Sequence, residues 1–164
     1  MAETLSITAN QEDRTAVYAQ LLPQLEALLA GETDEIACMA NVTAALKEAF
    51  SFFWVGFYRV MGNELVLGPF QGSLACIRIA HGRGVCGTSW KNNASVLVPD
   101  VDAFPGHIAC SSLSRSELVV PLKDTAGICR GVLDIDSSEV NYFDERDRIG
   151  IEAICAMVSR AIYQ

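Results

Sequence analysis

The residue whose surroundings best suit chemistry is a cysteine in an irregular segment. Cys110 lies in the stretch Phe104–Ser112, where a proline, a glycine and serines are typical of loop backbone. Loop N–H groups and His107, three residues earlier, are expected to favour the thiolate of Cys110 over its thiol. The sequence therefore predicts that Cys110 is a nucleophile. The alternative is that it only packs, as free cysteines commonly do.

Two further cysteines lie in segments that suit a redox partner. Cys86 falls in a glycine-rich turn into a short helix, whose N-terminus is expected to stabilise a thiolate. Cys76 alternates with Arg78 along an expected strand, so its thiol is predicted to share a face with a positive charge. Taken alone, a cysteine in either setting is more often a core residue than a redox one.

Aromatic and acidic residues supply a candidate binding pocket. Trp54, Gly56 and Tyr58 alternate along one strand, and the glycine between two large rings predicts a hollow with aromatic walls. Asp134 and Asp136 share a strand face, where their carboxylates would repel if desolvated and would attract an ammonium or a metal. Glu117 opens an apolar strand directly after the Cys110 loop. Ordinary aromatic core and solvated strand-end carboxylates are the alternatives.

These residues need a frame, and the chain pattern supplies one. A first helix is expected over about 13–30, with Pro23 kinking or splitting it. A second is expected over about 34–49, and its core-facing residues are predicted to be Ile36, Met39, Ala40, Thr43 and Leu46. A third is expected from about 144 to the end of the sequence. Strands are expected at 52–60, 64–67, 75–79, 95–98, 117–122 and 128–135, with a long ordered loop over 98–116. Helices, then hairpin-linked strands, then a closing helix predict an α+β fold, a mainly antiparallel sheet with helices packed on it.

Composition limits the possible partners. The 164 residues suit one domain, 1–164, and 51% hydrophobic residues are enough for a core. A net charge of −8 without a basic cluster argues against nucleic acid or an anionic membrane as partner. The sequence shows no signal peptide and no membrane-spanning run, so a cytoplasmic location is expected. Six cysteines are too few for a disulfide scaffold in a chain of this length.

Five motifs in this order resemble those of the free methionine-(R)-sulfoxide reductases, a family with a GAF domain. They are Gly68–Gly72 (GPFQG), Leu74–Ile79 (LACIRI), Gly82–Thr88 (GRGVCGT), Gly106–Cys110 (GHIAC) and Gly131–Ser137 (GVLDIDS). The resemblance spans most of the chain. It departs locally at His81, at Trp90 and at the two serines after Cys110, which concerns the pocket rim.

The resemblance implies a GAF-like domain and a role for each candidate residue. Cys110 would be the catalytic cysteine, Cys76 the resolving cysteine and Cys86 an auxiliary resolver. Trp54, Tyr58, Glu117, Asp134 and Asp136 would line the substrate pocket. The expected enzyme is a cytoplasmic homodimer that reduces free methionine-(R)-sulfoxide without cofactor or metal.

In the expected mechanism, the sulfoxide oxygen passes to Cys110 as a sulfenic acid, with Glu117 as proton donor, Asp136 sharing that work and Asp134 holding the substrate ammonium. Cys76 then forms a disulfide that thioredoxin or a similar dithiol reduces.

Two other interpretations stay open. One is a zinc protein using Cys76, His81, Cys86, His107 and Cys110. The other is a small-ligand sensor without chemistry.

Overall fold

The computed structural model describes residues 4–164 and is built around one six-stranded antiparallel sheet. Along the chain the elements are α1 (Arg14–Leu29), α2 (Glu35–Phe50), β1 (Trp54–Met61), β2 (Glu64–Gln71), β3 (Arg78–Ala80), α3 (Gly84–Asn92), β4 (Val96–Val98), the 3-10 turn η1 (Val101–Ala103), β5 (Ser116–Lys123), β6 (Cys129–Ser137) and α4 (Glu145–Ile162). The strand order across the sheet is β3-β2-β1-β6-β5-β4. The predicted α+β fold is confirmed.

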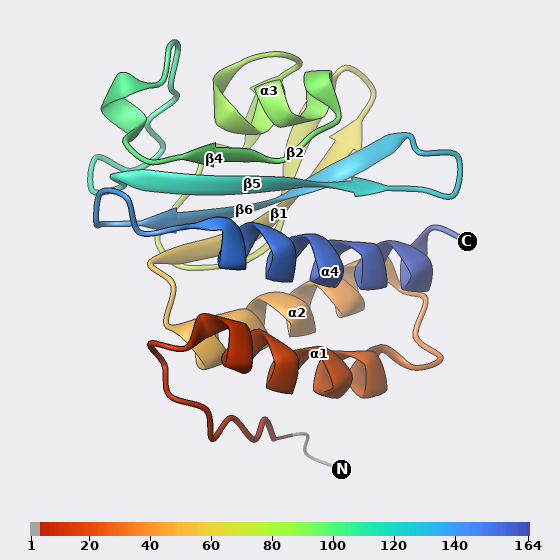
Figure 1. The fold of residues 1–164 in the computed structure, drawn as a ribbon. Helices are drawn as coiled ribbons and strands as arrows, with labels where there is room; N and C mark the ends of the chain where they lie inside the picture. The colour runs from red at the N-terminus through yellow and green to blue at the C-terminus, as the bar shows by residue number, and fades with distance from the viewer. Residues whose placement is uncertain (1–3) are drawn as a thin grey trace.

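The helices are distributed unequally over the two faces of the sheet. Figure 1 shows α1, α2 and α4 stacked below the sheet, whereas α3 and the loop after β4 lie above it. Each face therefore has its own core. The lower core includes Val55, Phe57 and Leu133, and the upper core includes Trp54, Tyr58 and Val132. Since side chains of a strand alternate between faces, neighbouring residues of β1 and β6 serve different cores.

The long helices begin where the sequence predicts. Asp13, Asp34 and Asp144 are N-caps whose carboxylates accept backbone N–H groups. The expected split of the first helix is wrong, because α1 runs through Pro23 without interruption. Pro23 is exposed, while Leu21 and Leu25 on either side are buried, so packing keeps both halves in one helix.

The predicted inner face of α2 is partly wrong. Met39, Thr43 and Leu46 are buried, but Ile36 is 46% exposed and Ala40 is also exposed. Cys38, Val42 and Ala45 are buried instead. The face of α2 that packs on the sheet is therefore rotated away from Ile36 and Ala40.

The strands differ from expectation at one place that concerns the site. The hairpin of β1 and β2 is confirmed, but β1 runs one residue further than expected, so that Met61 pairs with Glu64. However, β3 begins only at Arg78, so Cys76 lies in the loop before the strand. The predicted sharing of a face by Cys76 and Arg78 is therefore wrong. Arg78 instead forms an ion pair with Glu64 across the β2–β3 ladder, with a separation of 2.8 Å.

A buried carboxylate joins the first and last helices. Asp147 of α4 is fully buried, accepts a hydrogen bond of 2.9 Å from the Tyr18 hydroxyl and forms an ion pair with Arg14. It also accepts the backbone N–H of Asp144, which completes a capping box. These contacts fix α1 against α4 below the sheet. No helix within residues 4–164 is long and apolar enough to cross a bilayer.

The contact between α1 and α4 gives a stability test at Gly150. A Cβ atom at this position would overlap the Tyr18 ring, so Gly150→Ala should lower the free energy of unfolding by about 1–3 kcal/mol, although alanine is the better helix former. Ala156, exposed on the same helix, is the control. There Ala156→Gly should cost at most about 1 kcal/mol. Urea unfolding measures both, and a stabilised Gly150→Ala variant would contradict this packing.

Candidate active site

Three neighbouring strands bring the predicted acidic and aromatic residues into one row. Trp54 of β1 pairs with Asp136 of β6, and Asp136 pairs with Glu117 of β5. Asp134 lies two residues before Asp136 on β6 and pairs with Gly56 of β1. Because residues two apart on a strand share a face, all these side chains point to the upper side of the sheet, under α3. The predicted common face of Asp134 and Asp136 is confirmed.

Two carboxyl groups of this row are buried and that of Asp136 is half-buried, which contradicts the solvated strand-end interpretation. Glu117 and Asp134 are each 6% exposed. Burial, reinforced by the neighbouring Asp136 charge, raises the pKa of Glu117 to about 8. Burial and then Glu117 raise the pKa of Asp134, and burial and then Asp134 raise that of Asp136. Glu117 therefore holds its proton near neutral pH, and Asp134 Oδ1 has no hydrogen-bond partner among the described residues.

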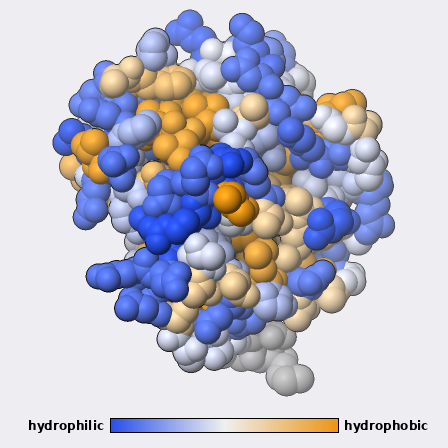
Figure 2. Space-filling view, in the orientation of Figure 1, coloured by the Kyte–Doolittle hydropathy of each residue, from blue (hydrophilic) through white to orange (hydrophobic). Residues whose placement is uncertain are grey.

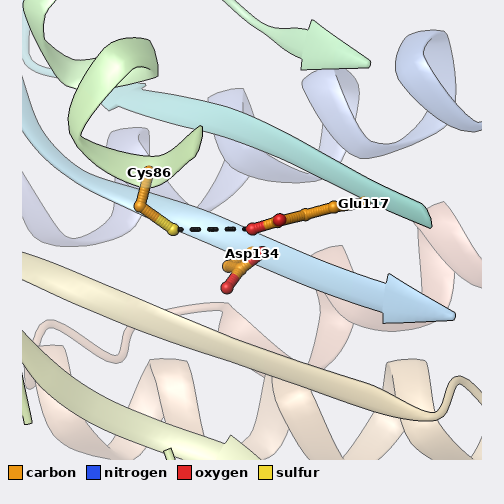
Figure 3. A group of neighbouring side chains, drawn as sticks. All are labelled: Cys86, Glu117 and Asp134. Carbon is orange, nitrogen blue, oxygen red and sulfur yellow. Dashed lines mark hydrogen bonds between the residues drawn. The ribbon is translucent and has the colours of Figure 1, made fainter. Parts of the chain in front are cut away.

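Cys86 closes this carboxyl cluster from above. It lies in the first turn of α3, is 3% exposed, and places Sγ 4.0 Å from Glu117 Oε1, as Figure 3 shows. Burial, followed by the charges of Asp134 and Glu117, raises the pKa of its thiol. The predicted thiolate at Cys86 is therefore wrong, because loss of solvation and nearby carboxylates outweigh the helix N-terminus.

Cys76 and Cys110 come together although 34 residues separate them. The structure joins them in a disulfide with a Cα–Cα distance of 5.4 Å. Cys110 lies in the loop between η1 and β5 and is exposed, as predicted, whereas Cys76 is half-buried. Cys86 is not in this bond and remains a free thiol, as do the buried Cys38, Cys129 and Cys155. The structure thus places one accessible cysteine pair beside the carboxyl cluster.

Trp54 and Tyr58 hold the segment that carries Cys76. The Trp54 indole N–H donates to the carbonyl of Ser73, and the Tyr58 hydroxyl donates to the carbonyl of Cys76, at 3.0 and 2.9 Å. The predicted hollow at Gly56 is wrong, because the Trp54 ring folds back over this glycine and packs against Phe70. The free space lies beside the two rings instead, on the side of the carboxyl groups.

His107 has a different partner from the one predicted. Its Nε2 lies 3.4 Å from Glu117 Oε2. Burial lowers the pKa of His107, although the Asp102 charge partly opposes this shift. The expected positive charge beside the Cys110 thiolate is therefore not supported, since the imidazole tends to be neutral and contacts the acid.

The site encloses a cavity of about 30 Å³. Its lining includes Trp54, Tyr58, Cys86, Cys110, Glu117, Asp134 and Asp136. All predicted site residues thus line one cavity except Cys76, which is bonded to the lining residue Cys110.

The predicted zinc ligands do not form a set. Cys76 and Cys110 are bonded to each other, and His81 packs edge-on against Trp90. Within residues 4–164 one group has the spacing of metal ligands, with Cys86, Glu117 and Asp134 offering atoms within 4.8 Å of one another. A cation there would have to displace protons from groups whose pKa values burial has raised. This chemistry favours a protonated cluster.

Several contacts of the site had no signal in the sequence. The bonds from Trp54 and Tyr58 to the Cys76 segment connect residues 18 or 19 positions apart. Ile108 covers Gly84, whose φ of +60° and close contact with Ile108 leave little room for a side chain. Arg83 and Ser114 complete the cavity rim. Such contacts depend on loop paths, which local patterns do not specify.

The chain is similar in sequence to known GAF-domain proteins. Residues 32–162 match the GAF domain model. Over 148 residues the chain is 60% identical to "GAF domain-containing protein A" of Dictyostelium discoideum, covering 90% of this chain and 92% of the relative. It is 44% identical over 151 residues to "Free methionine-R-sulfoxide reductase" of Escherichia coli, covering 92% and 91%.

A solved structure extends these similarities to three dimensions. The free methionine-R-sulfoxide reductase of Neisseria meningitidis, determined in complex with its substrate, superposes with a TM-score of 0.94 at 51% identity, covering 98% of this chain and 95% of the other. The predicted resemblance is thus confirmed by sequence and by fold. The chain belongs to the GAF-domain family of free methionine-R-sulfoxide reductases.

Proposed function

We propose that this protein reduces free methionine-(R)-sulfoxide to methionine, using Cys110 and Cys76 as its redox pair. The observation that carries the proposal is the disulfide between these cysteines at a cavity lined by three carboxyl groups. A protein that only senses a ligand has no need of an accessible cysteine pair beside buried acids. Membership in the reductase family supports the same function.

The chemistry would proceed in two balanced steps. The Cys110 thiolate attacks the sulfoxide, the S–O bond of the substrate breaks, and one proton and the oxygen end on Cys110 as a sulfenic acid while methionine leaves. The Cys76 thiol then displaces the hydroxyl group, forming the disulfide and releasing water. Two electrons thus pass from the two thiols to the substrate.

Glu117 is the proton donor in this proposal. An acid with a pKa of about 8 keeps its proton at neutral pH and releases it to an oxygen that gains negative charge. Asp136, directly across the β5–β6 ladder, would share the proton load. The Cys86 thiol, in contact with Glu117 and buried, suits a partner of this acid better than a second resolving cysteine.

Asp134 is proposed to bind the substrate ammonium. Its Oδ1 is buried without a hydrogen-bond partner, so an N–H donor from the ligand would satisfy it and favour its ionised form. Trp54 and Tyr58 would enclose the remaining substrate atoms. A methionine inside a peptide has no free ammonium and would leave this acceptor unsatisfied, which explains selectivity for the free amino acid.

The cavity size is consistent with a state reached after product release. A space of about 30 Å³ holds a water molecule or two, not an amino acid. The Cys110 loop must therefore move for substrate to enter, which requires the disulfide to be reduced. Thioredoxin or a similar dithiol is the proposed reductant, and a cytoplasmic homodimer without cofactor is the proposed form of the enzyme.

Serine variants of the two cysteines should differ in the number of turnovers that they complete. Cys110→Ser should release no methionine, because the attacking sulfur is gone. Cys76→Ser should release about one methionine per chain and then fail to turn over with thioredoxin. The measurement is methionine released by reduced protein from racemic free methionine sulfoxide, with Cys155→Ser as control. Steady turnover by Cys110→Ser would overturn the scheme.

Glu117→Gln should affect activity and stability in opposite directions. Loss of the acid should lower kcat by about 10²-fold or more. Folded wild-type protein keeps a proton that the unfolded chain releases above its ordinary pKa, so stability falls as pH rises toward about 8. The variant lacks this penalty and should be more stable than wild type at pH 8, by on the order of 2 kcal/mol. At pH 4 the difference should disappear.

Activity at several pH values and urea unfolding at pH 4 and pH 8 check this prediction. The first-turnover rate of wild type should also decline as pH rises through about 8, where Glu117 loses its proton. Glu26→Gln, an exposed residue of α1, removes the same charge and should change neither property. Equal activity of Glu117→Gln and Glu26→Gln would remove Glu117 from its proposed role.

A further inference from the structure

The carboxyl cluster needs a route by which it regains its proton. If Glu117 gives a proton to the departing oxygen, it must be protonated again before the next turnover. Its two carboxyl oxygens face Cys86 and His107, at 4.0 and 3.4 Å. The Cys86 side is closed, because this thiol is 3% exposed and belongs to α3, which covers the cluster.

His107 differs from the other contacts of Glu117 in two ways. Its side chain keeps 14% of its surface exposed, so it reaches from the acid toward solvent. It also belongs to the loop that carries Cys110, three residues later, rather than to the sheet or to α3. Among the described contacts of Glu117 it is thus the side chain that connects the acid with both water and the reacting cysteine.

The imidazole is suited to move protons rather than to supply fixed charge. It has two ring nitrogens, so it can accept a proton at Nδ1 while it gives one from Nε2. The charged and titratable groups around the pair are Asp102 of η1, Arg83 before α3, Cys86 of α3, Asp134 and Asp136 of β6, and Glu117 itself. Burial lowers the pKa of His107, with Asp102 partly opposing this shift, so the neutral ring has a free nitrogen that can take a proton from solvent.

We propose that His107 is a positioning residue that returns protons from solvent to Glu117 between turnovers. After Glu117 has protonated the sulfoxide oxygen, His107 takes a proton from water or buffer at Nδ1 as it gives its Nε2 proton to the Glu117 carboxylate. Exchange with solvent then removes the Nδ1 proton and restores the one on Nε2, so the ring can donate again in the next turnover. This inference rests on the proposed function.

The loop position of His107 links the relay to the redox state. In the disulfide form the bond to Cys76 holds the loop, and the same loop sets His107 against Glu117. The acid is therefore reprotonated while the disulfide awaits reduction. When the loop opens for a new substrate, the relay withdraws and Glu117 keeps the proton it needs.

The test is steady-state reduction of racemic free methionine sulfoxide with dithiothreitol, which avoids dependence on a protein reductant. His107→Gln should lower kcat about 10-fold or more, leave KM within about twofold, and increase the solvent deuterium isotope effect on kcat. His107→Ala should show the same loss and regain part of its rate when imidazole is added. His81→Gln is the matched control, because His81 packs against Trp90 away from the cavity.

The outcomes separate the relay from a structural role and from the proposed function. A side chain that only held the loop would not be replaced by free imidazole, so failure of rescue in a folded His107→Ala protein overturns the relay. Equal kcat for His107→Gln and His81→Gln overturns it as well. Wild-type protein that releases no methionine would overturn the proposed function, and the relay with it.

Discussion

The burial of acidic side chains on one face of the sheet is the constraint on which the site depends. Glu117 and Asp134 are almost inaccessible, and within residues 4–164 no lysine or arginine forms an ion pair with either. Such groups reduce stability if they ionise. Burial therefore favours their protonated forms. With a pKa of about 8, Glu117 is an acid at neutral pH, and Asp134 keeps an oxygen without a hydrogen-bond partner among the described residues. In the core below the sheet, by contrast, the buried carboxylate of Asp147 accepts a hydrogen bond from Tyr18 and pairs with Arg14.

The sheet and the loops have different tasks in this arrangement. Antiparallel register fixes Trp54, Asp136 and Glu117 in one row across β1, β6 and β5, so the acids and an aromatic wall share a rigid support. The two sulfurs of the disulfide lie instead on segments outside regular strands, so their distance is not fixed by the strand register. Hydrophobic residues also reach the outer surface in scattered patches broken by hydrophilic ones, as Figure 2 shows for one face.

Features that depend on short-range patterns were predictable from the sequence. The alternation of side chains predicted that Asp134 and Asp136 share one face, and aspartates indicated where three helices begin. The composition of the loop predicted that Cys110 is exposed. Errors arose where a distant segment decided the outcome. The ring of Trp54 fills the space over Gly56. The strand β3 pairs with β2 only from Arg78, so Cys76 lies outside it. Carboxyl groups from β5 and β6 raise the pKa of the Cys86 thiol, contrary to the expected thiolate. The sequence could suggest His107 as a neighbour of Cys110, but its contact with Glu117 depends on how the loop crosses the sheet.

The chemistry of a thiol reductase poses conflicting demands, and the division between sheet and loop resolves them. A sulfur nucleophile must ionise and be reached by a second thiol, whereas the acid must stay dry and protonated. One rigid pocket cannot offer both environments to adjacent groups without each shifting the other. Here Cys110 stands on an exposed loop while Glu117 lies on a buried strand, and they meet only where the loop closes over the cavity. The disulfide between Cys110 and Cys76 holds the loop over the cavity. Because a cavity of about 30 Å³ is too small for an amino acid, in the proposed mechanism a second substrate would enter only after this bond has been reduced.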